Sequence, residues 1–379
     1  MSASLRSSLS GKNPETLSTS PSHESDEKGK DRSLLVMKEG RPYLNGMNTP
    51  SIYPLPVDLT ETNRHIMLAY LTLAVYETPL LSPELLQNPP RRVLEVGCDS
   101  GFWSAVCHQY FQSKGYLVSF IGIDMKPPAG INECYESMGM DWEYIQYDLR
   151  EPEWPIEDGS IDLVMARNLA MVFNGSGFSQ ASSEYVRVLR PGGTLEVWEH
   201  DFAIRSLKPQ IQAEDNEELA HLGVYPVGKT NSLGPALNPY VVEYNAWISS
   251  ALGDLGLTPM PSAFNVSLLA GCLVEGADAL EGMISKRLAV PLMALRWESV
   301  NGHRRVLTNA QAAIRQSALD SFIGMVEAFE PLLRKSNRKN DDEWQEWLER
   351  AKKSWMLGTG LSLGECLEFG ALSLRKKKD

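Results

Sequence analysis

Short apolar runs alternate with helix-compatible segments over much of the first half of the chain. The strands predicted from the apolar runs cover residues 92–97, 116–124, 142–147, 161–166 and 194–198. The helices predicted between them cover residues 102–113, 131–138 and 181–189. Short apolar strands that alternate with helices indicate a parallel sheet covered on both faces. We therefore expect an α/β fold with a mostly parallel sheet.

The residues before this region predict a small covering segment. Apolar residues at 34–37 and 43–44 flank Gly40 and predict a hairpin, and the prolines of residues 52–57 impose an extended path. Asp58 or Thr60 is expected to cap a helix that runs to about Glu77. Its predicted apolar face comprises Ile66, Tyr70, Leu73 and Ala74.

Beyond residue 206 the regular alternation stops and longer helical patterns take over. Helices are predicted over residues 239–255 and 310–333, and a further helix is predicted to start at Asp341 or Asp342. Strands are predicted within residues 288–295 and 366–374. We expect four regions: a disordered tail (1–33), an N-terminal hairpin and helix covering a ligand site (34–90), a ligand-binding core (91–206), and a helical region that shapes a substrate pocket and ends in the last sheet strands (207–379).

Composition excludes several classes of protein. The net charge of −12 argues against a nucleic-acid-binding protein, which normally carries a basic surface. The five cysteines are odd in number and form no Cys-x-x-Cys pair, and the six histidines show no metal-ligand spacing, so no metal site is predicted. No secretory signal or long apolar span is recognised, so we expect a cytoplasmic protein without a membrane partner.

A glycine-containing turn follows the first predicted strand of the core. It reads Glu95-x-Gly97-x-x-x-Gly101, and the chain then enters a helix-compatible stretch. Such turns let the backbone approach a nucleotide-like ligand closely. The Gly-x-Gly-x-x-Gly pattern of nicotinamide dinucleotide sites is broken by Asp99 and Phe102, so an oxidoreductase is disfavoured. Glu95 suits a ligand with a cationic amino group better than a pyrophosphate.

Further polar residues stand at the ends of the next strands, where open parallel sheets bind ligands. Asp124 ends the second strand and is placed to accept hydrogen bonds from ribose hydroxyls. Asp148 follows the third strand and can accept from the exocyclic amine of adenine, while Leu149 packs on the ring. A Pro-Gly-Gly turn at residues 191–193 leads into the fifth strand. The order of these features, rather than any one of them, carries the prediction.

Residues 92–199 resemble class I S-adenosylmethionine-dependent methyltransferases, with the family's first motif at residues 93–104. The resemblance implies a Rossmann-like sheet with helices on both faces and helical additions at both ends. It also implies S-adenosylmethionine as cofactor. The implied cofactor-binding residues are Glu95, Gly97, Cys98, Gly101, Asp124, Met125, Asp148, Leu149, Arg167 and Tyr53.

The chain is similar, more narrowly, to fungal LaeA-like methyltransferases. The shared features are the Tyr-Pro-Leu-Pro entry at residues 53–58, Trp103, Arg-Asn-Leu at 167–169 and Leu-Glu-x-x-Glu at 195–199. This resemblance implies methyl transfer to a hydroxyl or amine of a small molecule in fungal secondary metabolism. The alternative is a LaeA-like regulator that acts through protein partners, with a nuclear role.

Two questions of chemistry stay open in the sequence. The family's middle glycine is replaced by Asp99, which tolerates left-handed backbone and could either bind the donor's ammonium or repel its carboxylate. Glu199 and His200, expected just past the fifth strand at the cleft, are the candidate catalytic bases, and Asn168 could orient an acceptor. His200 could equally be a loop histidine in water.

Overall fold

The computed structural model describes residues 34–47, 52–127, 131–208, 219, 221–228, 232–262, 279–300, 303–304, 306–357 and 360–378. The predicted disordered tail at residues 1–33 lies outside these ranges. Contacts group Ser33–Asp379 into one unit. The three divisions predicted within it, at 34–90, 91–206 and 207–379, are therefore parts of a single unit.

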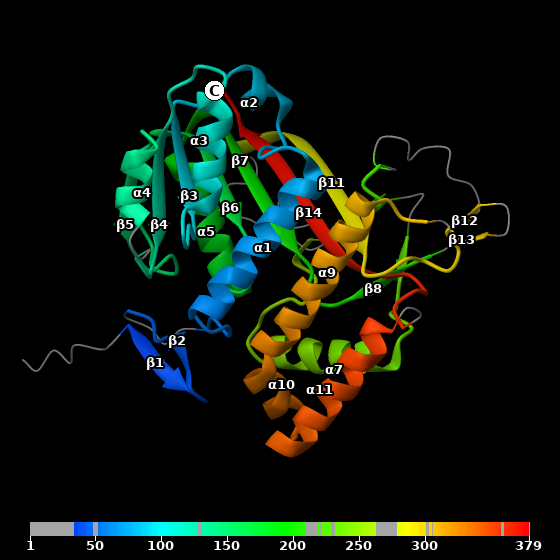
Figure 1. The fold of residues 1–379 in the computed structure, drawn as a ribbon. Coiled ribbons are helices and arrows are strands. Elements are labelled where there is room, and N and C mark those ends of the chain that lie inside the picture. Colours follow the sequence, from blue (N-terminus) through cyan, green and yellow to red (C-terminus); the bar gives the residue numbers. More distant parts are fainter. Residues whose placement is uncertain are drawn as a thin grey trace, which may run out of the picture. The chain divides into compact units, whose positions relative to one another are not determined.

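A mostly parallel sheet forms the centre of this unit (Figure 1). Strands β5, β4, β3, β6 and β7 lie side by side in that order and are parallel. Strand β14 pairs antiparallel with β7, and β11 pairs antiparallel with β14. Short strands β8, β10 and β9 extend this edge. The strands of the sheet are β3 (Arg92–Val96), β4 (Ser119–Asp124), β5 (Asp141–Gln146), β6 (Ile161–Arg167), β7 (Leu189–His200), β8 (Arg205–Leu207), β9 (Tyr225–Pro226), β10 (Leu233–Gly234), β11 (Leu280–Pro291) and β14 (Glu365–Lys376).

Alternate residues of the central strands enter two separate apolar clusters, one on each face of the sheet. Val93 and Leu163 pack in a cluster with side chains of α1, α3 and α9. Leu94 and Val164 pack in a second cluster with side chains of α5. Because side chains alternate along a strand, near-continuous apolar strands are what a sheet buried on both faces requires. The predicted Rossmann-like α/β fold is confirmed.

The helices follow the predicted order, with some shifted boundaries. Helix α5 begins six residues before the predicted start because the Asn174 side chain accepts a hydrogen bond from the Gly177 amide at 3.0 Å. Strand β7 extends beyond the predicted 194–198 at both ends. The helices are α1 (Leu59–Tyr76), α2 (Pro83–Gln87), α3 (Phe102–Gln112), α4 (Ile131–Ser137), α5 (Gly175–Val188), α7 (Pro239–Gly253), α9 (Asn309–Ala328), α10 (Glu330–Asn337) and α11 (Asp341–Met356).

Helix α1 is tied at its start to the N-terminal hairpin, strands β1 (Leu35–Lys38) and β2 (Arg41–Leu44). Asp58 caps the helix by accepting from the Glu61 amide at 2.9 Å. The same carboxylate accepts two hydrogen bonds from Arg41 of β2, at 2.6 and 2.9 Å. Arg41 thereby lowers the pKa of Asp58, although partial burial opposes it. The predicted hairpin, cap and helix are confirmed.

The predicted apolar face of α1 is wrong at Tyr70 and Ala74, whereas Leu73 packs against the core and Ile66 lines a pocket. Tyr70 is 54% exposed and Ala74 is also exposed. The helix instead buries Leu68, Ala69, Leu71, Thr72, Val75 and Tyr76, together with the charged Glu61. Two adjacent apolar stripes exist on this helix, and composition alone does not say which one meets the core.

The C-terminal half differs from prediction at two helix boundaries. The predicted helix over residues 310–333 is two helices, α9 and α10, with Pro331 in the first turn of the second. Proline lacks an amide hydrogen and clashes with the preceding turn, so a continuous helix cannot pass through it. Helix α11 is capped by Asn340, not by Asp341 or Asp342. The Asn340 and Glu343 side chains each accept from the other's backbone amide at 3.0 Å.

Helix α9 lies beside α1 (Figure 1). A Cβ atom on Gly324 of α9 would lie 3.3 Å from Cδ of Arg64 on α1, so this glycine gives Arg64 its space. Strands β12 (Ser299–Val300) and β13 (His303–Arg304) form a separate small hairpin.

Among the described residues, no helix combines the length and apolar character needed to cross a membrane.

Candidate functional site

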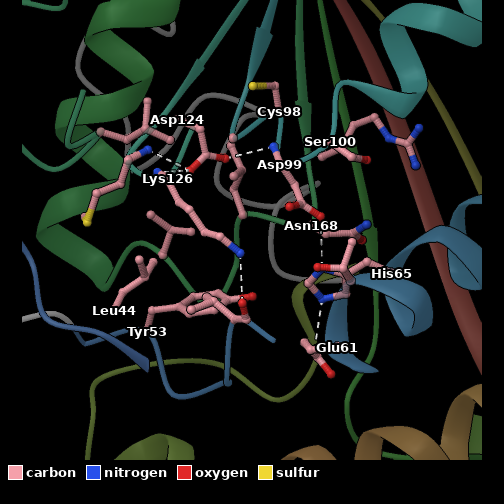
Figure 2. Close-up of a pocket in the computed structure, with 18 of the residues that line it drawn as sticks. Leu44, Tyr53, Glu61, His65, Cys98, Asp99, Ser100, Asp124, Lys126 and Asn168 are labelled. Carbon is pink, nitrogen blue, oxygen red and sulfur yellow. Dashed lines mark hydrogen bonds and ion pairs between the residues drawn. The ribbon is translucent and has the colours of Figure 1, made fainter. Parts of the chain in front are cut away.

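A pocket lies at the carboxyl ends of β3, β4 and β6 (Figure 2). Helix α1 and the extended segment before it supply the facing wall. No described residue after Val172 lines it, so the expectation that residues 207–379 line a substrate pocket is not met there. The lining residues are Leu44, Tyr53, Pro56, Val57, Glu61, Thr62, His65, Ile66, Ala69, Glu95, Gly97, Cys98, Asp99, Ser100, Phe102, Trp103, Asp124, Met125, Lys126, Asp148, Leu149, Arg150, Arg167, Asn168, Leu169 and Val172.

The turn after β3 forms the floor of the pocket, and two of its residues must be glycine. Gly97 has φ +66°, and a Cβ there would lie 2.4 Å from Leu169 Cδ2. Gly101 has φ +65°, and a Cβ there would lie 2.9 Å from the Trp142 ring. Gly101 does not line the pocket but is the N-cap residue of α3. Asp99 between them also has positive φ, +44°. The glycine positions of the motif are thus explained by backbone geometry and space.

Asp124 at the end of β4 holds this turn in place. One carboxylate oxygen accepts from the Asp99 amide at 2.9 Å, and the other accepts from the Met125 amide at 2.6 Å. Burial raises the pKa of Asp124 to about 6. The side chain therefore both shapes the glycine turn and lines the pocket.

Two side chains of opposite charge line the pocket near the turn. Glu95 Oε2 accepts from the amide and the hydroxyl of Ser104, at 3.1 and 2.6 Å, and burial raises its pKa to about 7. The Arg167 guanidinium lies 3.4 Å from the centre of the Trp103 ring. Its Nε and Nη1 are buried with no hydrogen-bond partner among the described residues, and burial lowers its pKa to about 10. A buried donor without a partner is costly, and a ligand with an anionic group would satisfy it.

Asp148 is buried, at 1% exposure, and already has a cationic partner. Arg150 donates two parallel hydrogen bonds to its carboxylate, at 2.9 Å from Nε and 2.6 Å from Nη2. Arg150 lines the pocket beside Leu149 and was not predicted from the sequence. Each carboxylate oxygen has more than one acceptor position, so a further donor can still bind Asp148.

The predicted catalytic residues Glu199 and His200 do not line the pocket. Their placement just past the strand is wrong, because β7 continues to His200 and pairs with β14 there. Glu199 Oε1 accepts from the amides of Leu169 and Ala170 at 2.9 and 3.1 Å, which fixes the loop after β6. Burial raises the pKa of Glu199 to about 8.

His200 is a core residue rather than a loop histidine in water. It is 3% exposed, and its ring centre lies 4.8 Å from that of Phe202. Its Nδ1 lies 3.0 Å from Oδ1 of Asn168, which does line the pocket. Burial lowers the pKa of His200 well below its usual value. The imidazole is therefore neutral and supports Asn168 from behind.

Sequence reasoning missed the groups that α1 brings to the pocket. Glu61 and His65 stand one helical turn apart and both line it (Figure 2). The signal in the sequence is their spacing of four residues just after the Asp58 cap, which places both side chains on one face of α1. Lys126, also missed, donates to the Val57 carbonyl at 2.8 Å and joins the two walls. Of the other predicted residues, Tyr53, Cys98, Met125 and Leu149 line the pocket as listed above.

Residues 93–193 match the family model of a methyltransferase domain. This stretch spans the glycine turn, Asp124, Asp148 and Arg167. The matched stretch thus contains most of the pocket, and the wall formed by α1 and its preceding segment lies outside the match.

Two curated proteins resemble the chain. The phthiotriol/phenolphthiotriol dimycocerosates methyltransferase of Mycobacterium leprae (strain TN) is 30% identical over 141 residues, which is 34% of this chain and 49% of the relative. The phthiotriol/phenolphthiotriol dimycocerosates methyltransferase 1 of Mycobacterium ulcerans (strain Agy99) is 31% identical over 183 residues, which is 43% of this chain and 60% of the relative. The chain thus spans about half to three fifths of the length of these relatives.

Solved structures that match the chain include the YcgJ protein from Bacillus subtilis, with a TM-score of 0.39 and 13% identity over 78% of this chain and 97% of that one. A geranyl diphosphate methyltransferase solved in complex with SAM has a TM-score of 0.37 and 11% identity over 83% of this chain and 90% of that one.

Proposed function

We propose that this protein is an S-adenosylmethionine-dependent methyltransferase that transfers a methyl group to a hydroxyl or amine of a small molecule. The observation that carries the proposal is the pair of buried, opposite charges in the pocket, Glu95 and Arg167, beside the glycine turn. A zwitterionic amino acid end fits such a pair, with its carboxylate on Arg167 and its ammonium on Glu95. The match of residues 93–193 to a methyltransferase domain supports the same conclusion.

The remaining predicted residues fit the rest of the donor. Asp124 lines the pocket at the end of β4, where it is placed to accept from ribose hydroxyls. Met125 and Leu149 are apolar walls for a flat ring, and Asp148 is an acceptor for an exocyclic amine. Gly97 permits the left-handed turn, closely packed against Leu169, that forms the floor of the pocket. These roles stand as parts of the proposal.

The donor's sulfonium, when bound, supplies a methyl group that is already activated for displacement. The protein's own task is then to hold donor and acceptor in line and to exclude water. Tyr53, Pro56 and Val57 of the segment before α1 cover the pocket opposite the sheet. Lys126 bonds to this segment at Val57, so the cover is fixed directly to the end of β4.

The narrower expectation is a LaeA-like enzyme of fungal secondary metabolism, located in the cytoplasm. Its support is that three of the resembling features, at residues 53–58, Trp103 and residues 167–169, contribute side chains to the pocket. The mycobacterial relatives are named as methyltransferases of phthiotriol and phenolphthiotriol dimycocerosates. Small-molecule acceptors are therefore the first class to test.

Calorimetry with S-adenosylmethionine and S-adenosylhomocysteine tests the donor site. We expect both to bind, and we expect Asp124→Ala to weaken binding at least tenfold, since a lost ribose contact of about 1.4 kcal/mol is a factor of ten. Asp141→Ala is the matched control, because Asp141 is exposed at the opposite end of β5. Isotopically labelled donor, incubated with protein and cell extract, then identifies the methylated acceptor by mass spectrometry.

Absence of heat with both ligands would contradict the enzyme proposal. That result would favour the alternative, a LaeA-like regulator that acts through protein partners. Equal loss of binding in Asp124→Ala and Asp141→Ala would show that the effect is general destabilisation rather than loss of a donor contact.

A further inference from the structure

His65 stands between two carboxylates on the α1 side of the pocket (Figure 2). Its Nε2 lies 3.1 Å from Oε1 of Glu61, one turn earlier on the same helix. Its Nδ1 lies 3.9 Å from Oδ2 of Asp99, in the turn after β3. The imidazole is 28% exposed and the Asp99 carboxylate is 43% exposed. The group is therefore accessible from the pocket rather than locked in the core.

Glu61 is a fixed anion. Arg64 donates to both of its oxygens, at 2.9 and 2.5 Å, and Gly324 of α9 leaves Arg64 the space to do so. Burial opposes ionisation, but the charge of Arg64 and the hydrogen bonds from His65 and Arg64 lower the pKa of Glu61. A carboxylate can only accept, so His65 must donate Nε2–H to Glu61.

The tautomer that follows leaves the lone pair on Nδ1. At 3.9 Å, Nδ1 and the Asp99 oxygen are too far apart for a direct hydrogen bond. Nδ1 is thus a free acceptor at the pocket wall, and a carboxylate stands close enough to stabilise positive charge on the ring. This is the arrangement of a base oriented from one side by a carboxylate.

The charged and titratable groups that face His65 come from three parts of the fold. Glu61 and Arg64 lie on α1, Asp99 lies after β3, and the neutral His200 faces it from β7. Burial and Arg64 lower the pKa of His65, and Asp99 and Glu61 raise it; the two carboxylates prevail, so the pKa is raised above its usual value.

We propose that His65 is the general base that deprotonates the methyl acceptor, with its ring oriented by Glu61 and its protonated form stabilised by Asp99. This proposal rests on the proposed methyltransferase function. As the acceptor's oxygen or nitrogen bonds to the methyl carbon, the carbon–sulfur bond breaks and its electron pair stays on sulfur. The acceptor's proton passes to Nδ1 of His65. The resulting imidazolium lies between Glu61 and Asp99 and later releases the proton to solvent.

The assignment gives Asp99 a role that a glycine at the same position could not have. Its amide bonds to Asp124 on the donor side, and its carboxylate faces His65 on the other side. One residue therefore links the proposed donor site and the proposed base. The proposal therefore implies an acceptor whose nucleophilic atom carries a proton that must be removed. Such an acceptor is a hydroxyl or a protonated amine.

Imidazole NMR on histidine-labelled protein with S-adenosylhomocysteine tests the base without needing an acceptor. We expect the Nε2–H tautomer for His65 and a titration above that of a free histidine. Asp99→Asn should lower that titration by roughly half a pH unit or more, since a partly exposed pair is screened by solvent. An Nδ1–H tautomer, or no shift in Asp99→Asn, would overturn the proposal.

Transfer of labelled methyl from S-adenosylmethionine to a deproteinised extract tests the role in turnover. We expect His65→Gln to slow labelling about a hundredfold or more, with donor affinity within threefold of wild type. The wild-type rate should fall as pH drops below the His65 titration, and Asp99→Asn should move that fall to lower pH. The exposed His221, changed to Gln, is the matched control.

The outcomes separate this inference from the proposed function. If the wild type neither binds donor nor labels the extract, the methyltransferase proposal fails. If the wild type labels the extract and His65→Gln does so at the same rate, or loses donor affinity as much as rate, the base assignment fails alone. If the wild type binds donor but finds no acceptor in the extract, the NMR result decides.

Discussion

Glu199 provides a quantitative test of how burial sets charge in this protein. The residue is 5% exposed. One carboxylate oxygen accepts from the amides of Leu169 and Ala170, and the other has no hydrogen-bond partner among the described residues. Burial raises its pKa from 4.5 to about 8. Gln is the neutral mimic of the protonated acid and keeps the acceptor oxygen. We therefore choose Glu199→Gln as the perturbation.

The sign follows from proton linkage. A raised pKa in the folded state means that the stability Glu199 contributes is complete below pH 4.5 and is lost as pH rises towards 8. The unfolded chain releases the proton in this window while the folded chain keeps it. With values of 4.5 and about 8, the wild type loses about 2 kcal/mol relative to Glu199→Gln between pH 6 and pH 8.

Urea unfolding at pH 6, 7 and 8 measures this difference. The free energy of unfolding of Glu199→Gln should rise relative to wild type by about 2 kcal/mol across the series. Glu349→Gln, an exposed position on α11, should instead follow the wild type at every pH. A constant gap between Glu199→Gln and wild type would refute the reasoning, because it would mean that the buried carboxyl group is already ionised at pH 6.

Three further predictions concern the glycine turn, the start of α1 and the buried guanidinium in the pocket. Gly97→Ala should lower stability by about 1–3 kcal/mol in urea unfolding, because the backbone is left-handed and the methyl group meets Leu169; unchanged stability would mean that the turn can relax. Asp58→Ala should lower the free energy of unfolding by about 1–2 kcal/mol, since both the α1 cap and the ion pair with Arg41 are lost. Asp58→Asn should lose less stability, because it keeps the capping oxygen, and thermal melts followed by circular dichroism measure both variants. Arg167→Met should keep or raise the stability of the ligand-free protein, since it removes a buried guanidinium with two nitrogens that lack hydrogen-bond partners among the described residues. Calorimetry should show donor binding at least tenfold weaker. A parallel loss of stability and binding would assign Arg167 to the core.

The alternation of apolar runs was enough to predict the central strands and their helices. Strands β3, β4 and β6 are buried on both faces, so each carries a nearly continuous apolar run that stands out against the polar loops, whereas the edge strand β5 is only partly buried. The glycine turn could also be predicted, since positive φ and lack of space require glycine at positions 97 and 101. Constraints of this kind act within a few residues, so they can be predicted from the residues on the spot.

The α1 side of the pocket could not be predicted in the same way. Whether Glu61 and His65 face the pocket depends on the rotation of α1, which is set by α9, more than two hundred residues later in the chain. The predicted placement of Glu199 and His200 at the pocket was wrong for a related reason. Their removal from the pocket follows from the pairing of β7 with β14, and no pattern near residue 199 reports that partner.

Strand β14 also has a consequence for how the protein is made. It lies between β7 and β11, although it follows both in the chain. Until residues 365–376 have been synthesised, the edges of β7 and β11 that face β14 have no partner, and unpaired strand edges recruit other chains. The nascent protein therefore depends on late, long-range closure of its sheet, which favours slow folding and a need for protection by chaperones. Truncation before residue 365 should accordingly yield aggregates rather than a smaller folded protein.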